Sequence, residues 1–153
     1  MKPLLMLLVI ALQSFGVAAM DMRLTAVDGS KHNLNQYRGK WLVVNYWATW
    51  CPPCIVEMPE LQSFHDDHVD GNAMVLGINA ELISKEKLAE FLDDYFITYP
   101  NFVSRPGRVS KLGQVPGLPT TFMVSPEGEV VARQVGPVTR EMLEKFIAKH
   151  SAE

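Results

Sequence analysis

The chain has 153 residues, of which 48% are hydrophobic and 20% are charged, a composition typical of a single globular domain with its own core. Its formal net charge is -3 at pH 7. No run of lysine or arginine is present, so nothing in the composition indicates a nucleic-acid-binding protein.

The first residues differ from the rest of the chain. Lys2 is followed by a nearly unbroken apolar run at residues 4–15, and small residues offer a cleavage site after Ala19. The run is about a dozen residues long, shorter than the roughly 20 needed to span a bilayer. We therefore expect residues 1–19 to be a signal peptide, with an uncleaved anchor as the alternative. Residues 20–153 are expected to form one domain.

Apolar patterns in the next part of the chain predict an N-terminal β-hairpin, a buried strand, a helix and a second buried strand. Apolar residues at helical spacing place the helix from Pro52 or Pro53 to about His68, and Pro59 should kink it. The expected strands are residues 22–26, 31–34, 41–47 and 73–80.

The rest of the chain predicts two more long helices and several short elements. Ser84 can cap a helix with one apolar stripe, made of Leu88, Phe91, Leu92, Tyr95 and Phe96. Thr139 can cap the last helix, whose inward residues should be Met142, Leu143, Phe146 and Ile147. Between them we expect a strand at 102–103, a short helix at 107–114, a strand after the prolines of 115–119 and a strand at 129–135. This order predicts an α/β fold with a mixed sheet covered by helices on both faces.

Cys51 and Cys54 are the only cysteines. A structural disulfide gains stability with the length of the loop it closes, and a two-residue spacer closes almost nothing, so this pair is expected to do chemistry. A strand delivers Cys51 to the N-terminus of a helix, where the dipole and free N–H groups favour a thiolate. Cys51 is the predicted nucleophile in disulfide exchange, and Cys54, one turn inward, is the predicted resolving thiol.

Pro52 and Pro53 between the cysteines carry no backbone N–H. A thiolate at Cys51 therefore has fewer hydrogen-bond donors and is less stabilised. A less stabilised thiolate disfavours the reduced form relative to the disulfide, which makes the couple more reducing. The spacer thus predicts a reductant.

Other roles for these residues have less support. A zinc site needs four ligands, and no further cysteine exists. His65 and His68 with the acids between them are more typical of a polar helix end than of a metal site. The methionines raise a copper(I)-handling protein as an alternative, although Met58, Met74, Met123 and Met142 are expected at core positions. A thiol peroxidase is a third alternative.

The motifs WATWCPPCIVEMP and VPGLPTTFMVSPEGEVV resemble the thioredoxin-fold superfamily, and within it the TlpA/ResA-like periplasmic thiol–disulfide reductases. The resemblance spans residues 22–147, and residues 79–105 resemble the insert of that branch. It implies a thioredoxin-like three-layer fold with a βα-type insert.

The resemblance also implies roles for single residues. Cys51 resembles the exposed nucleophile and Cys54 the resolving cysteine. Pro119 matches the cis-proline that faces the disulfide, where the backbone of Leu118 would pair with an extended substrate. Glu57 resembles the acidic residue beside the cysteines and could hold the proton that leaves Cys54.

Asn45 stands where ordinary thioredoxins have a buried acid. Because Asn45 cannot accept a proton, that duty would pass to Glu57 or to water. Trp50, Pro52 and Pro53 are expected to contact the substrate beside the cysteines.

The resemblance further implies an exported, periplasmic protein, anchored in the inner membrane only if residues 1–19 are retained. It would reduce disulfides in other exported proteins and receive electrons from a transmembrane donor of the DsbD type. No cofactor is expected beyond the Cys51–Cys54 disulfide. Some family members serve cytochrome c maturation, but nothing in this sequence selects that substrate.

Overall fold

The computed structural model describes residues 21–104, 107 and 109–151. The predicted signal peptide at residues 1–19 lies outside the described residues. Within those residues, no helix has the length and apolar character of a membrane span.

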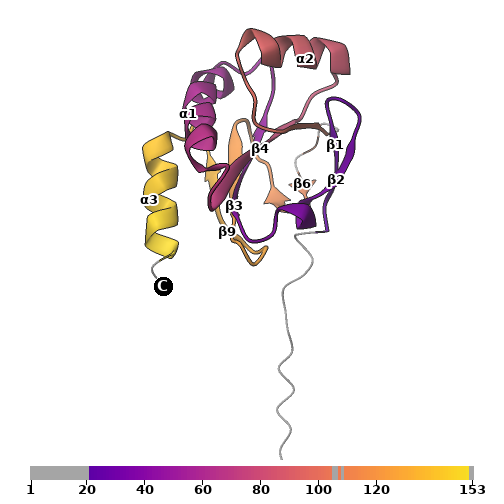
Figure 1. Ribbon diagram of the computed structural model, residues 1–153. Helices are drawn as coiled ribbons and strands as arrows, with labels where there is room; N and C mark the ends of the chain where they lie inside the picture. Colours follow the sequence, from indigo (N-terminus) through magenta and orange to yellow (C-terminus); the bar gives the residue numbers. More distant parts are fainter. Residues whose placement is uncertain (1–20, 105–106, 108, 152–153) are drawn as a thin grey trace, which may run out of the picture.

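The described residues form a mixed α/β domain (Figure 1). Its strands are β1 Arg23–Ala26, β2 Lys31–Asn33, β3 Trp41–Trp47, β4 Ala73–Asn79, β5 Asn101–Val103, β6 Val109–Ser110, β7 Gly113–Gln114, β8 Thr120–Val124 and β9 Val130–Val135. Its helices are the 3-10 helix η1 Leu34–Tyr37 and the α-helices α1 Pro52–His68, α2 Lys85–Asp94 and α3 Arg140–His150.

Seven strands form the central sheet in the order β2-β1-β5-β4-β3-β8-β9. The two central strands, β3 and β4, are parallel, and every residue of both is buried, as their apolar runs predicted. β8 and β9 add in antiparallel fashion on one side. On the other side β5 is parallel to β4, and the hairpin β1–β2 closes that edge. α2 and β5 lie within residues 79–105, the predicted insert.

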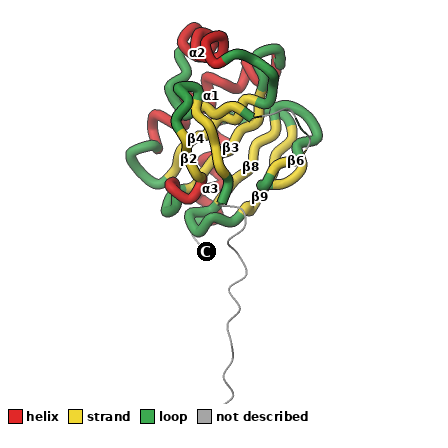
Figure 2. Tube along the Cα trace, turned by 90° about the vertical axis from the view of Figure 1, so that its right-hand side faces the viewer, coloured by secondary structure: helices red, strands yellow, loops and turns green. Residues whose placement is uncertain are grey.

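All three described α-helices pack on one face of the sheet, with α1 and α3 side by side (Figure 1). Their buried side chains join one apolar cluster with alternate residues of β3, Val43 and Trp47. Leu42 and Val44 of β3 lie in the opposite cluster, together with Leu34 of η1. The three-layer arrangement is confirmed, but the second face is covered by η1 and the β6–β7 hairpin rather than by an α-helix. Figure 2 views the molecule from the side of β2 and β6.

The helix limits agree with the expected capping signals. α1 begins at Pro52, with Cys51 as its N-cap residue, and runs to His68 with Pro59 inside it. The Oγ of Ser84 accepts a hydrogen bond from the N–H of Lys87 at the start of α2. Thr139 caps α3 in the same way. The N-terminal ends of these helices are therefore determined by residues close to them in the sequence.

The short helix expected at residues 107–114 is not formed. β6 and β7 pair there as a tight hairpin, in which Val109 pairs with Gln114. Gly113 has a φ of 139°, a conformation that only glycine adopts easily and that breaks helical geometry. Apolar spacing alone could not distinguish a turn of helix from this hairpin.

Two predicted apolar stripes are shorter than expected. Helix α2 ends at Asp94, and Phe96 takes a φ of 55° that turns the chain, so Phe96 is 82% exposed and Tyr95 is also exposed. In α3, Leu143 and Ile147 are buried, but Met142 is 46% exposed. In α2 the apolar periodicity was extended past the end of the helix, whereas Met142 lies in the first turn of α3, before the buried Leu143.

Gly77 of β4 leaves room for the buried side chain of Asn101 on the neighbouring strand β5. A Cβ on this residue would lie 2.1 Å from Oδ1 of Asn101. That oxygen accepts a hydrogen bond of 2.9 Å from Nε1 of Trp47, and the Asn101 amide donates to the carbonyl of Tyr99. Any side chain at Gly77 must therefore displace the buried partner of Trp47.

We expect Gly77→Ala to lower the free energy of unfolding by about 1–3 kcal/mol, because an added methyl group overpacks this contact. Urea denaturation of the oxidised protein measures the effect. Gly71→Ala is the matched control, since its Cβ would meet nothing closer than the His68 carbonyl oxygen at 3.4 Å. Equal stabilities of the two variants would contradict the prediction.

Candidate active site

The candidate site lies where β3 ends and α1 begins. Residues 48–51 form a turn, which we call the Cys51 turn, closed by a 3.2 Å hydrogen bond from the N–H of Cys51 to the carbonyl of Ala48. Pro52 follows immediately as the first residue of α1. The turn therefore places Cys51 at a helix N-terminus, as the sequence predicted, where a thiolate is favoured electrostatically.

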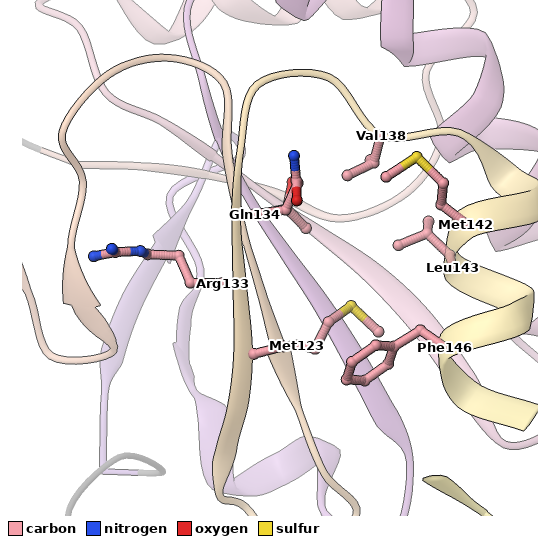
Figure 3. A pocket seen from close by; sticks show the side chains of 9 residues that line it. Met123, Arg133, Gln134, Val138, Met142, Leu143 and Phe146 are labelled. Atoms are coloured by element: carbon pink, nitrogen blue, oxygen red, sulfur yellow. The ribbon is translucent and has the colours of Figure 1, made fainter. Parts of the chain in front are cut away.

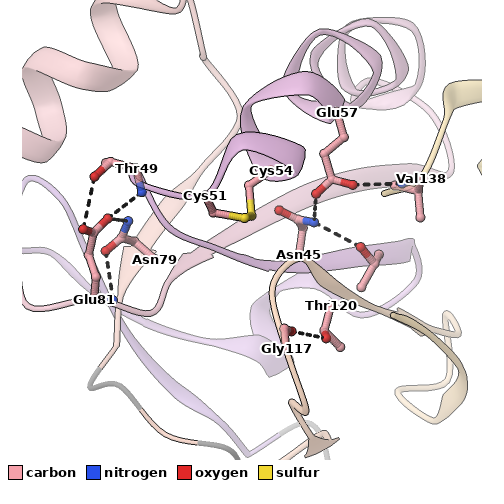
Figure 4. Close-up of a disulfide and its surroundings, with 11 residues drawn as sticks. Asn45, Thr49, Cys51, Cys54, Glu57, Asn79, Glu81, Gly117, Thr120 and Val138 are labelled. Carbon is pink, nitrogen blue, oxygen red and sulfur yellow. Dashed lines mark hydrogen bonds between the residues drawn. A yellow bond between two sulfur atoms is a disulfide. The ribbon is translucent and has the colours of Figure 1, made fainter. Parts of the chain in front are cut away.

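Cys51 and Cys54 are joined in a disulfide, with their Cα atoms 5.3 Å apart (Figure 4). Cys54 is fully buried and Cys51 is only 3% exposed. The expectation of an exposed Cys51 is therefore wrong for the disulfide form, because both residues are packed in the apolar cluster beneath the helices. The expected ranking holds, since Cys51 keeps what little contact with solvent the pair has.

Of the residues expected to bind substrate, three are exposed and two are partly or fully buried. Trp50 is 67% exposed, and Pro52 and Pro53 are exposed beside it. Leu118 is half-buried, and Pro119 is buried and follows a cis peptide bond. Pro119 directly precedes Thr120, which pairs with Tyr46 near the end of β3, so it lies at the disulfide end of the sheet.

Trp50 and Leu118 line one groove of about 390 Å³. The other described residues of its lining are Ala80, Gly107, Val115, Pro116 and Gly117. The structure thus brings together Trp50 and Leu118, which are far apart in the sequence. Pro52 and Pro53 do not line this groove. An apolar groove beside the disulfide can receive an apolar side chain of a bound polypeptide.

Glu57 is buried, with only 1% of its surface exposed. One carboxylate oxygen accepts a 2.6 Å hydrogen bond from Nδ2 of Asn45, and the other accepts a 2.9 Å bond from the N–H of Val138 (Figure 4). Burial raises the pKa of Glu57 to about 7, and the two hydrogen bonds act in the opposite direction. A carboxyl group with this pKa can take up or release a proton near neutral pH.

Asn45 connects Glu57 to the sheet. Its Nδ2 also lies 3.0 Å from Oγ1 of Thr121 on β8, so it bridges α1 and the neighbouring strand. The structure therefore places the Asn45 amide in direct contact with Glu57. This contact agrees with the idea that Glu57 takes over the proton-accepting role, which stays a prediction.

A second polar network beside the disulfide was missed by the sequence reasoning. The carboxylate of Glu81, in the loop after β4, accepts hydrogen bonds from the N–H and hydroxyl of Thr49 in the Cys51 turn (Figure 4). Asn79 donates to the same carboxylate. A usable signal existed, because Glu81 and Thr49 each follow a buried strand by two residues, and parallel neighbours end at the same edge.

The apolar cavity on the far side of Glu57 contains neither cysteine. It has a volume of about 240 Å³ and lies between β9 and α3, where Met123, Met142 and Phe146 line it (Figure 3). Val138, whose N–H binds Glu57, lies at its edge. The cavity is therefore separate from the disulfide and adjoins the site through Val138.

The histidines of α1 have protein partners. Nδ1 of the buried His65 lies 3.2 Å from the N–H of Val75, and Nδ1 of His68 lies 2.8 Å from the carbonyl of Phe64. Among the residues that the structure describes, no group of three or more His, Cys, Asp or Glu side chains is arranged to hold a metal ion.

Comparison with known proteins agrees with this geometry. Residues 15–133 match the model of the AhpC/TSA family. The chain is 33% identical over 134 residues to the thiol-disulfide oxidoreductase ResA of Geobacillus kaustophilus, covering 86% of this chain and 75% of that protein.

Two solved structures show the same fold. A DsbF homologue from Corynebacterium diphtheriae superposes with a TM-score of 0.74 at 27% identity, over 86% of this chain and 85% of that one. StoA from Bacillus subtilis gives a TM-score of 0.68 at 25% identity, over 82% and 94% of the two chains. The chain therefore belongs to the AhpC/TSA family of the thioredoxin fold and is a ResA-like thiol–disulfide oxidoreductase with its cysteine pair at Cys51 and Cys54.

Proposed function

We propose that this protein is an exported reductase that breaks disulfides in other exported proteins. The observation that carries the direction is the spacer between the cysteines. Pro52 and Pro53 occupy the first two positions of α1 and bring no N–H to the Cys51 sulfur. The thiolate is then less stabilised than at an ordinary helix N-terminus, which favours the disulfide form and makes the dithiol a better electron donor.

The reaction follows from the order of burial. The Cys51 thiolate attacks a substrate disulfide, so one substrate sulfur bonds to Cys51 and the other leaves as a thiolate. The Cys54 thiolate then attacks the Cys51 sulfur, which releases the second substrate thiolate and forms the Cys51–Cys54 disulfide. Two electrons have moved to the substrate, and no further cofactor is required.

Glu57 would accept the proton that leaves Cys54 before the second attack. Two observations support this role: the carboxyl group of Glu57 is buried three residues beyond Cys54, and its pKa is near neutrality. The hydrogen bonds from Asn45 and Val138 hold the carboxylate in place once the proton has left.

Substrate binding would use Trp50 and Leu118. Both line the groove beside the disulfide, and Leu118 directly precedes the cis peptide bond to Pro119. An extended polypeptide could lie along this groove and bring its own disulfide to Cys51.

Export is inferred from residues 1–19, whose charge and apolar pattern are those of a signal peptide. The protein would act in the periplasm, anchored in the inner membrane only if that segment is retained. A transmembrane donor of the DsbD type would return electrons to the Cys51–Cys54 disulfide, because an exported protein has no access to cytoplasmic NADPH.

Trapping tests the proposed function directly. In a Cys54→Ala variant the mixed disulfide on Cys51 cannot be resolved, so exported partner proteins should remain attached to it. Mass spectrometry of the complexes, separated without reductant, identifies the partners. A Cys51→Ala variant is the control and should retain none. If Cys51 is alkylated readily but no exported protein is recovered, the substrate assignment fails.

The proline spacer predicts the potential of the couple. We expect a reduction potential below about -200 mV, and a measured value near -120 mV, typical of a strong oxidant, would contradict the proposed direction. Pro52→Ala restores an N–H beside Cys51 and should make the potential less negative. Pro126→Ala restores an N–H in the distant β8–β9 turn and should leave the potential unchanged.

The raised pKa of Glu57 predicts a pH dependence of stability. The folded pKa of about 7 lies above the ordinary value of 4.5 for a glutamate, so the folded state binds the extra proton between these values. Stability should therefore fall by about 3 kcal/mol as pH rises through this window. Glu57→Gln should remove this slope, as measured by urea denaturation of the oxidised protein at several pH values.

The comparison with the variant is needed because His65 acts in the opposite sense. Burial lowers the pKa of His65, so its contribution to stability is lost as pH falls below about 6.5. The difference between the two proteins isolates Glu57. Parallel stability profiles from pH 4.5 to 7 would show that Glu57 is already ionised throughout.

A further inference from the structure

The loops after β3 and β4 leave the sheet side by side. Trp47 and Asn79 are paired in the parallel register, and the N–H of Ala80 donates a 2.9 Å hydrogen bond to the carbonyl of Trp47. The Cys51 turn and Glu81 are therefore neighbours, although 32 residues separate Thr49 from Glu81.

Glu81 uses its whole carboxylate to hold the Cys51 turn. Oε1 accepts hydrogen bonds of 2.7 Å from the N–H of Thr49 and 2.8 Å from Nδ2 of Asn79, and Oε2 accepts one of 3.1 Å from the hydroxyl of Thr49 (Figure 4). We call these contacts the Glu81 clamp. Hydrogen bonds to an ionised acceptor are stronger than those between neutral groups.

Asn79 makes the clamp rigid. It is fully buried at the end of β4, and its Oδ1 lies 3.4 Å from the N–H of Glu81, so both ends of its amide face the same residue. The carboxylate is thereby oriented from the sheet rather than from solvent. A side chain held in this way can position the loop that it contacts.

The clamp holds the residue that directly precedes Trp50 and Cys51, the two residues expected to contact the substrate. Thr49 precedes Trp50, which points outward into the groove, and Cys51, which points inward to Cys54. Pro52 and Pro53 contribute no N–H with which the following segment could hold this turn. Reduction removes the disulfide tether of Cys51, and no atom of the clamp takes part in that bond.

We propose that Glu81 is a positioning residue of the exchange reaction, which fixes the Cys51 turn so that the Cys51 sulfur and Trp50 keep their attacking geometry in the reduced protein. Glu81 does not react and does not touch the substrate. The proposal rests on the exchange activity of Cys51 and not on the identity of the substrate.

Two substitutions distinguish the effect of the hydrogen bonds of Glu81 from the effect of its charge. In Glu81→Gln the amide oxygen can accept from Thr49 and Asn79 while the amide nitrogen donates to the Thr49 hydroxyl, so the clamp is kept and the charge is lost. In Glu81→Ala both are lost. Glu90→Ala removes an exposed carboxylate on α2 and is the charge-matched control.

The experiment measures the reaction of each fully reduced protein with a short synthetic peptide that carries an intramolecular disulfide. The rate constant is followed against pH to its plateau, where Cys51 is fully ionised, at a temperature where circular dichroism shows every variant folded. A charge effect changes the pH midpoint, and a loss of position lowers the plateau.

We expect Glu81→Ala to lower the plateau roughly tenfold and Glu81→Gln to restore it to within about threefold, because a small displacement of a reacting atom has effects of this size or larger. Glu90→Ala should match the unmodified protein. Equal plateaus for Glu81→Ala and Glu81→Gln, or no loss in Glu81→Ala, would overturn the proposal.

Thr49→Val provides an independent test if Glu81→Ala does not fold. It removes the hydroxyl bond to Oε2 and keeps the N–H bond to Oε1, so the plateau should fall by a smaller factor. An unchanged plateau in Thr49→Val would count against the clamp. Failure of the unmodified protein to reduce the peptide would instead refute the proposed reductase function, whatever the Glu81 variants do.

Discussion

Parallel pairing of β3 with β4 is the constraint on which the site depends. Because the two strands run in the same direction, the loops that follow Trp47 and Asn79 emerge together at one edge of the sheet. One loop carries Cys51 and the other carries Glu81. β8 runs antiparallel to β3 and enters at the same edge, just after Pro119. Three segments distant in sequence thus meet at one disulfide.

Close packing at this end of the sheet accounts for the burial of Cys51 and Cys54. Gly77 lets Asn101 approach β4, and Asn101 binds the indole of Trp47 immediately before the Cys51 turn. The cysteines then fall within the apolar cluster shared by the sheet and the three described α-helices. Solvent therefore reaches little more than the edge of Cys51.

Glu57 is the ionisable group at the centre of this apolar environment. Burial opposes its charge, while the N–H groups of Asn45 and Val138 favour the charge, and the balance places its pKa near neutrality. Glu81, by contrast, is only partly buried and accepts three hydrogen bonds. The two carboxylates beside the disulfide are therefore suited to different tasks, one to proton exchange and the other to holding a loop.

Local signals predicted much of this protein from its sequence. The start of the active-site helix at Pro52, the caps at Ser84 and Thr139 and the buried runs of β3 and β4 each depend on neighbours in the chain, and each was confirmed. Apolar spacing failed in three places. Residues 107–114 form a hairpin instead of a helix, and Phe96 and Met142 lie outside the core that their spacing suggested.

The sequence by itself determined which residues can exchange electrons and at which helix end they stand, because spacing along one helix is a local property. Only the tertiary structure decided that Cys51 is nearly buried, that Glu57 contacts Asn45, and that Glu81 holds Thr49. Burial and hydrogen bonds between residues far apart in the chain depend on how strands are ordered in the sheet, and no local pattern contains that order.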